Sequence, residues 1–211
     1  MTWPIAGAVD LLGVAFLAAS GAIAAAERRG DIVTFLFFGA MTGIGGGTLR
    51  DVLIGQPVFW IHAPAYLTAC VAAACLVWLC PPILVPKDAL LWADAVGLAA
   101  YAVVGAEKAV ALGLGGGVCV AMGVLTACLG GVLRDVLAGQ PSVLLRREIY
   151  VTAAIGAASA DVVLDSLGVN RAVSVLAGVS LGLAIRGCAL VWGWALPSFG
   201  AREPGSDRIS R

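Results

Sequence analysis

Long apolar stretches separated by short polar breaks run along almost the whole chain. Several of them are long enough to cross about 30 Å of hydrocarbon as an α-helix. Because backbone in lipid must satisfy its own hydrogen bonds, we predict that all of these stretches are helical. The seven predicted spans cover residues 5–26, 32–54, 63–82, 89–109, 115–138, 148–167 and 172–195.

The chain repeats itself with an offset of 84 residues. Residues 42–57 read T-G-I-G-G-G-T-L-R-D-V-L-I-G-Q-P, and residues 126–141 read T-A-C-L-G-G-V-L-R-D-V-L-A-G-Q-P. Without any gap, 22 of the 60 positions from 10 to 69 carry the same residue 84 places later. These identities include the Gly, Arg and Asp of the motif, so they are not a chance similarity of apolar segments. The sequence therefore indicates an internal duplication centred on a glycine-rich L-R-D motif.

Each repeat holds three spans, so the second copy must enter the bilayer from the opposite side. The sequence thus predicts an inverted repeat, an arrangement found in many transport proteins. We expect an all-α integral membrane protein in which two inverted three-helix repeats are followed by a seventh helix. The expected units are residues 1–84, 85–168, the seventh span within 169–196 and a polar tail over 197–211.

Basic residues in the loops set the expected orientation. With the N-terminus outside and the C-terminus in the cytoplasm, the inner loops hold eight basic residues and the outer loops two, leaving aside the motif arginines. This is the positive-inside pattern. The inner residues are Arg28, Arg29, Lys87, Arg146, Arg147, Arg202, Arg208 and Arg211, and the outer ones are Lys108 and Arg171.

Composition agrees with a multi-pass membrane protein. Hydrophobic residues make up 61% of the chain and charged residues 12%, with a mean hydropathy of +0.99, whereas about a quarter of the residues in a soluble domain are charged. The net charge of zero gives no indication of a nucleic-acid partner. The N-terminus has no basic region and no cleavage site, so we expect no removable signal peptide.

Enzyme motifs are absent from the sequence: it has no H-E-x-x-H and no nucleotide-binding loop. We therefore expect no enzymatic activity, no catalytic residue, no cofactor and no structural metal. The cysteines lie within or at the ends of apolar spans without a C-x-x-C pair, which favours small apolar fillers over ligands or disulfides. They are Cys70, Cys75, Cys80, Cys119, Cys128 and Cys188.

Two glycine runs occupy matching places in the second and fifth spans. They are Gly45-Gly46-Gly47 and Gly130-Gly131, with Leu129 in place of the first glycine of the second run. Consecutive glycines favour a kink or an unwound turn. Two broken helices at matching places predict a permeation or substrate site. The alternative is that the small residues let helices pack closely.

Charged residues in the motif are expensive inside an apolar span unless they are paired or hydrated. Arg50 and Asp51 form one pair of neighbours, and Arg134 and Asp135 form the other. Because neighbours on a helix point to different faces, we predict pairing between the repeats, Arg50 with Asp135 and Arg134 with Asp51. The alternative is that both arginines extend to the level of the lipid headgroups.

The spans contain few other polar residues, and two roles are possible for each of them. Lys108 has Ala24 as its counterpart in the first repeat, and it is either a membrane-interface anchor or a pore-facing gate. Asp10 and Asp94 are either partners of a helix dipole or pore residues. Ser20, Thr42 and Thr126 either line a cavity or hydrogen-bond within their own helix. These three are hydroxyl residues of the predicted spans.

Three motifs together resemble a known family. G-G-G-T-L-R-D-V-L-I-G with P-V-F-W after it, G-A-E-K-A-V-A-L-G in the fourth span, and G-G-V-L-R-D-V-L-A-G resemble bacterial members of the trimeric intracellular cation (TRIC) channel family. The same bacterial proteins are also labelled as putative glycine transporters. The resemblance covers about residues 5–195. The exception is Leu129, which shortens the second glycine run.

The resemblance implies a homotrimer in the bacterial inner membrane, surrounded by lipid, with a separate pore in each protomer. It further implies that kinked second and fifth helices line the pore. Potassium would be the main ion that passes through this pore, and sodium would also pass. The implied kinks lie at Gly45, Gly46, Gly47, Gly130 and Gly131. The implied charged lining or gate comprises Arg50, Asp51, Arg134, Asp135 and Lys108.

Three functions are compatible with these features. A passive monovalent cation channel would use carbonyl oxygens and helix-end dipoles along a hydrated path. A secondary transporter of glycine or another small amino acid would bind the carboxylate at a half-helix N-terminus and the ammonium at an aspartate. A scaffolding membrane protein would need no pathway. We predict the channel, although inverted repeats and broken helices are common to the channel and the transporter.

Overall fold

The computed structural model describes residues 4–81, 83, 85–145 and 148–197. From residue 198 onward, the predicted polar tail lies outside these residues, as do Arg146, Arg147 and the three arginines of the tail that entered the orientation prediction.

The described part of the chain is helical, and each predicted span corresponds to one helix. A short helix, α3, precedes the third span and was not predicted. The elements are α1 (Pro4–Glu27), α2 (Ile32–Leu53), α3 (Phe59–His62), α4 (Ala65–Leu79), α5 (Ala89–Ala111), α6 (Gly116–Leu137), the 3₁₀ helix η2 (Val143–Leu145), α7 (Val151–Ser166) and α8 (Arg171–Trp192).

Five of these helices are long and apolar enough to cross a membrane, by length and composition: α1, α2, α5, α6 and α8. The helices α4 and α7 have 15 and 16 residues. At about 1.5 Å per residue they are shorter than a full span. The multi-pass membrane character expected from the sequence therefore rests on five helices, with two shorter ones beside them.

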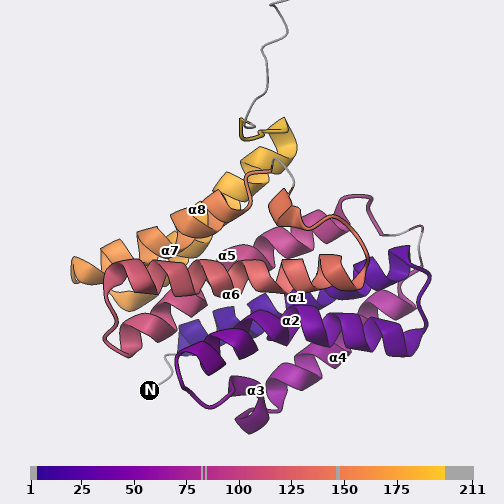
Figure 1. The fold of residues 1–211 in the computed structure, drawn as a ribbon, viewed down its shortest axis with the longest axis horizontal. Helices are drawn as coiled ribbons and strands as arrows, with labels where there is room; N and C mark the ends of the chain where they lie inside the picture. Colours follow the sequence, from indigo (N-terminus) through magenta and orange to yellow (C-terminus); the bar gives the residue numbers. More distant parts are fainter. Residues whose placement is uncertain (1–3, 82, 84, 146–147, 198–211) are drawn as a thin grey trace, which may run out of the picture.

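The helix α5 is the centre of the bundle. It packs against α1, α6, α7 and α8, and in Figure 1 α4 lies on one side of the bundle while α7 and α8 lie on the opposite side. The core is built largely from alanines together with a few larger side chains, of which Leu17, Leu98 and Tyr101 are fully buried. Small side chains on neighbouring faces let helices approach closely where the hydrophobic effect gives no extra driving force.

The helices α2 and α6 approach most closely at the repeated motif. A Cβ added to Gly46 would overlap the carbonyl oxygen of Thr126, and one added to Gly130 would lie 2.6 Å from the carbonyl oxygen of Thr42. The two contacts are equivalent under the offset of 84 residues. The glycines Gly46 and Gly130 are therefore required for the crossing of these helices, as the close-packing alternative predicted.

Both glycine runs remain helical throughout, so neither helix has an unwound turn. The expectation of freed backbone groups at this place is wrong. The physical reason is that a glycine without Cβ lets a neighbouring backbone approach while the helix keeps its own hydrogen bonds. A bend of the helix axis at the glycines stays a prediction.

The last glycine of each run, Gly47 or Gly131, has a different neighbour. A Cβ on Gly47 would lie 2.7 Å from the ring of Phe59, and one on Gly131 would overlap the hydroxyl of Tyr150. By contrast, a Cβ on Gly45 would meet only the end of the flexible Leu133 side chain. This difference agrees with the second repeat, in which Leu129 stands at the position of Gly45.

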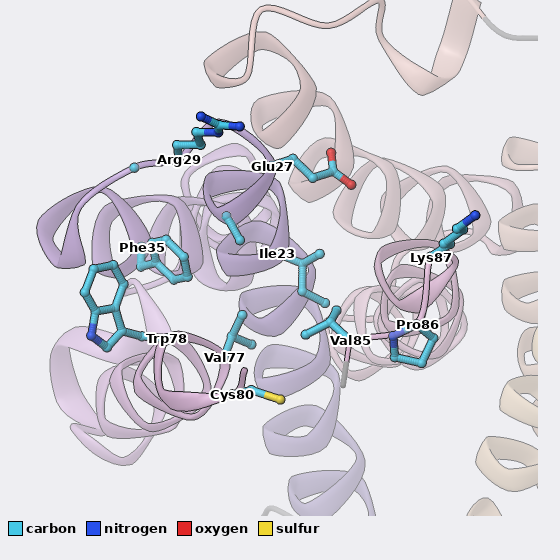
Figure 2. Close-up of a pocket in the computed structure, with 12 residues that line it drawn as sticks. Ile23, Glu27, Arg29, Phe35, Val77, Trp78, Cys80, Val85, Pro86 and Lys87 are labelled. Atoms are coloured by element: carbon cyan, nitrogen blue, oxygen red, sulfur yellow. The ribbon is translucent and has the colours of Figure 1, made fainter. Parts of the chain in front are cut away.

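A groove opens at the end of the bundle where α1 ends, α2 begins and α4 ends (Figure 2). Its volume is about 430 Å³, its walls include Ile23, Phe35 and Val77, and Arg29 and Lys87 lie at its margin. These two basic residues come from different polar breaks of the sequence. The fold thus brings both breaks to the same end of the bundle, as the orientation prediction requires.

Substituting Gly46 with alanine should force α2 and α6 apart, because the new methyl group would overlap the Thr126 carbonyl. Overpacking of this kind costs about 1–3 kcal/mol, so we expect earlier thermal unfolding of the detergent-solubilised protein. Gly45→Ala is the matched control, since its methyl group meets only a flexible side-chain end. Equal unfolding temperatures of the two variants would contradict the assigned role of the crossing.

Candidate functional site

The first charge cluster is centred on Asp51 near the end of α2. Its Oδ1 accepts hydrogen bonds from Arg50 Nε at 2.8 Å and from Lys108 Nζ at 2.7 Å. Its Oδ2 accepts from the Phe59 backbone amide at 2.9 Å. The Asp51 side chain is fully buried and that of Arg50 is 2% exposed. A buried carboxylate with three donors is well compensated, and for Asp51 these donors come from α2, α3 and α5 together.

The second cluster is centred on Arg134 near the end of α6. Arg134 Nη1 lies 2.6 Å from Asp94 Oδ1, and Arg134 Nε lies 3.0 Å from Asp135 Oδ1. The Val143 amide donates to Asp135 Oδ2 at 2.7 Å. Arg134 also reaches Ser20 Oγ at 3.4 Å. This cluster joins α6 to α1 and α5.

The two clusters are equivalent under the offset of 84 residues. In each, the aspartate after the arginine accepts the amide eight residues later. In each, a tyrosine hydroxyl reaches an aspartate near the start of the first helix of the repeat: Tyr66 to Asp10 at 2.7 Å and Tyr150 to Asp94 at 3.5 Å. The duplication therefore preserves a site as well as a sequence motif.

The repeated G-Q-P sequence explains how each aspartate reaches that amide. Gly55 and Gly139 have φ values of 65° and 60°, the left-handed conformation that ends a helix. The Gln56 amide returns to the Asp51 carbonyl at 2.8 Å, and the Gln140 amide to the Asp135 carbonyl at 2.9 Å. The chain thus turns back over the helix end and brings its next amides to the aspartate.

The predicted pairing between the repeats is wrong. Each motif arginine binds the aspartate next to it in sequence, Arg50 with Asp51 and Arg134 with Asp135. Neighbouring Cα–Cβ bonds do diverge on a helix, but the long arginine side chain curls back far enough to reach its neighbour. The headgroup alternative is also wrong, since Arg50 and Arg134 are 2% and 3% exposed.

The two clusters differ in their partners: Asp94 binds Arg134 in the second, whereas a lysine is added to the first. Lys108, which is about one-third exposed, binds Asp51, so it belongs to the first cluster and is more than an interface anchor. Its counterpart, Ala24, lines a cavity of about 300 Å³ that also includes Arg134, Asp135, Lys87 and Gln140. The second cluster therefore faces open space where the first has a lysine. Arg50 Nη1 and Asp10 Oδ1 have no hydrogen-bond partner among the described residues.

Two of the three predicted hydroxyl residues hydrogen-bond within their own helix, and a role for the three in lining a cavity stays a prediction. Thr126 donates to the Met122 carbonyl at 2.6 Å, within its own helix. Ser20 donates to the Leu17 carbonyl at 2.8 Å and also touches the second cluster through Arg134. Thr42 is fully buried, and its hydroxyl has no partner in the described part of the chain. Thr42 and Thr126 both lie at the crossing of α2 and α6.

Sequence reasoning missed the tyrosines and the backbone amides as parts of the site. Tyr66 and Tyr150 were visible as matched residues of the duplication, but nothing near them in sequence pointed to the aspartates 56 residues away. The conserved spacing after G-Q-P was the available signal for the Phe59 and Val143 amides. Without the fold, neither observation identifies the aspartate to which the tyrosine or the amide donates.

Comparisons with known proteins agree with this arrangement. The sequence model of a family described as glycine transporter matches residues 8–82 and 91–166, one segment in each repeat. The chain is 36% identical to the UPF0126 inner membrane protein YadS of Escherichia coli K12, over 93% of this chain and 97% of that protein. It is 35% identical to a UPF0126 membrane protein of Vibrio cholerae, over 90% of this chain and 81% of that protein.

Two solved structures share the fold. The crystal structure of a TRIC trimeric intracellular cation channel orthologue from Rhodobacter sphaeroides has a TM-score of 0.84 and 42% identity, covering 91% of this chain and all of that one. A structure described as the basis for conductance through TRIC cation channels has a TM-score of 0.82 and 30% identity, covering 93% and 98%. The chain therefore belongs to the bacterial branch of the TRIC family, whose sequence model is described as glycine transporter.

Proposed function

We propose that this protein is a passive monovalent cation channel that prefers potassium and also passes sodium, with a hydrated pore in each protomer along α2 and α6. The observation that carries this proposal is the pair of equivalent carboxylate clusters at opposite ends of these two helices. Rings or clusters of carboxylates at the mouths of a pathway raise the local concentration of cations. The similar structures are described as TRIC cation channels.

The charges of the two clusters suit a cation path in which one end attracts cations and the other end repels them. The second cluster sets Asp94 and Asp135 against Arg134, which leaves an excess of negative charge beside the open cavity. In the first cluster, Lys108 adds a second cation beside Asp51. A cation entering from the second cluster would be attracted, and one at the first would meet Lys108. We infer that Lys108 limits the current.

Opening of the path requires α2 and α6 to separate at their crossing. Gly46 and Gly130 pack there against carbonyl oxygens of the partner helix. Bending at the glycine runs would move these contacts apart and expose Thr42 and Thr126 to the path. We therefore propose kinks at Gly45, Gly46, Gly47, Gly130 and Gly131 in the conducting form, with Ser20, Asp10 and Asp94 beside them.

A second candidate function is secondary transport of glycine or another small amino acid, which the description of the family model favours. Such a transporter would bind the ammonium group of its substrate at Asp51 or Asp135 and the carboxylate at an arginine. Both aspartates are already occupied by arginines and backbone amides. A substrate would have to displace these partners, so we rank this function second.

The distinguishing experiment is recording from the purified protein in planar bilayers under asymmetric potassium chloride. We expect discrete openings that reverse near the potassium equilibrium potential and do not change when glycine is added. Glycine counterflow in liposomes of the same preparation, without discrete openings, would replace the channel by the transporter.

We also propose a homotrimer with one pore in each protomer, embedded in lipid. The similar Rhodobacter sphaeroides protein is described as trimeric. Three separate pores predict up to three equal conductance levels for each inserted unit in the same recordings. A single indivisible level would contradict one pore per protomer.

Replacing Lys108 by glutamine should increase the cation current. Removing one partly screened positive charge next to the path lowers the barrier by about 1 kcal/mol, which is roughly fivefold in rate. The control is Arg28→Gln, because Arg28 is an exposed basic residue outside both clusters. The variant and control are compared by single-channel current at equal voltage, and an unchanged Lys108→Gln current would remove this residue from the path.

The chain is proposed to lie in the bacterial inner membrane as two inverted three-helix repeats and a seventh helix, with the N-terminus outside. In support, Arg29 and Lys87 line one groove at one end of the bundle, while Glu107 binds Arg171 beyond it at the other. A fluorescent protein that matures only in the cytoplasm, fused to the C-terminus, should be bright. A dark but membrane-inserted fusion would reverse the orientation.

A further inference from the structure

Two buried carboxyl groups lie next to each other outside both charge clusters. Glu107 comes from α5 and Asp161 from α7, where these helices pack against each other and against α8. Asp161 is fully buried and Glu107 is 7% exposed. Charged groups at such positions in a membrane-spanning bundle are costly unless each is compensated.

Only one of the two groups has a basic partner. Arg171, at the start of α8, donates to Glu107 Oε2, and its Nη2 also reaches the Glu107 carbonyl oxygen at 3.4 Å. Glu107 Oε1 and both Asp161 oxygens receive no N–H or O–H from any other described residue. The two carboxyl groups are close enough to interact with each other, so a proton between them is a partner that these oxygens can share.

A hydrogen bond between two carboxyl groups needs a proton, because an ionised carboxylate can only accept. Two ionised carboxylates at this separation would also repel each other in a medium of low dielectric constant. Arg171 neutralises one negative charge and leaves the second uncompensated. The pair is therefore electrically balanced when it carries one proton.

We propose that Glu107 and Asp161 form a proton-binding site that holds one proton between their carboxyl groups, with Arg171 balancing the remaining charge. This proposal does not depend on channel activity. No third side chain that could complete a metal site joins the pair in the described part of the chain. A proton, rather than a divalent cation, is the ligand that the site fits.

The surrounding groups supply no other proton donor. On α7, Asp165 lies one turn beyond Asp161 and is partly exposed. On α6, the Cys119 thiol donates to the Leu114 carbonyl at 3.2 Å. On α8, the Ser174 hydroxyl donates to the Asn170 carbonyl at 3.4 Å. Lys108, the next residue on α5, is directed to Asp51.

The carboxyl pair occurs only in the second repeat, because the equivalent positions of the first repeat are apolar. The residues 84 positions before Glu107 and Asp161 are Ile23 and Val77. Both line the apolar groove of Figure 2. In the second repeat, α8 packs on the equivalent face of α5 and α7 and brings Arg171. Since the Arg171 side chain is 30% exposed, the site can exchange its proton with the side on which α8 begins.

The test is infrared spectroscopy of the purified, full-length protein, which distinguishes the C=O band of a protonated carboxyl from the bands of carboxylates. At neutral pH we expect the wild type to show a band that loses one carboxyl per protomer in Asp161→Asn and in Glu107→Gln. Asp165→Asn, which removes an equivalent charge one turn away, should leave the band unchanged. Equal spectra of the wild type and Asp161→Asn would overturn the proposal.

A second measurement, the pH dependence of the unfolding temperature, tests the proposal on the wild type, so that it does not depend on the folding of a variant alone. Raising the pH removes the shared proton and leaves two adjacent carboxylates in the folded protein, so the unfolding temperature of the wild type in detergent should fall. Asp161→Asn places a permanent donor opposite Glu107 Oε1 and should lose this dependence. Retention of the wild-type pH dependence in Asp161→Asn would contradict the proposal.

Discussion

The compensation of buried charge inside an apolar bundle is the constraint on which the rest of this structure depends. Asp51 and Asp135 are buried near the helix ends, and each binds a motif arginine and a backbone amide eight residues later. Removing one partner would leave an uncompensated charge, which is more costly than losing an ordinary contact. The L-R-D-x-x-x-G-Q-P sequence is thus one structural device, in which the glycine turn returns the chain to the aspartate that precedes it.

Close approach of backbones is the second requirement, and the glycine runs meet it. Gly46 and Gly130 let α2 and α6 cross in contact with carbonyl oxygens, whereas Gly47 and Gly131 leave room for Phe59 and Tyr150 beside the clusters. Each glycine of the repeated G-G therefore has a separate neighbour. In the proposed conducting form, this crossing would have to open.

The departures from symmetry are more informative about function than the symmetry itself. Lys108 fills a position that is Ala24 in the other repeat, and it gives Asp51 a second basic partner. Glu107 and Asp161 replace the apolar pair Ile23 and Val77 where α8 covers the second repeat. The two repeats share one arrangement of helices. They differ at the positions where only one of them borders an open cavity or packs against an additional helix.

The sequence by itself indicated the apolar helices, the duplication and the charged motif residues of the two clusters. These follow from hydrophobic length and from an exact linear offset, both of which are properties of the chain alone. Only the tertiary structure decided which aspartate each arginine binds, that Lys108 reaches Asp51, that the glycines serve the crossing, and that Glu107 meets Asp161. The reason is physical: such partners depend on side-chain reach and on how helices distant in sequence cross, and neither is encoded in the spacing of residues along one helix.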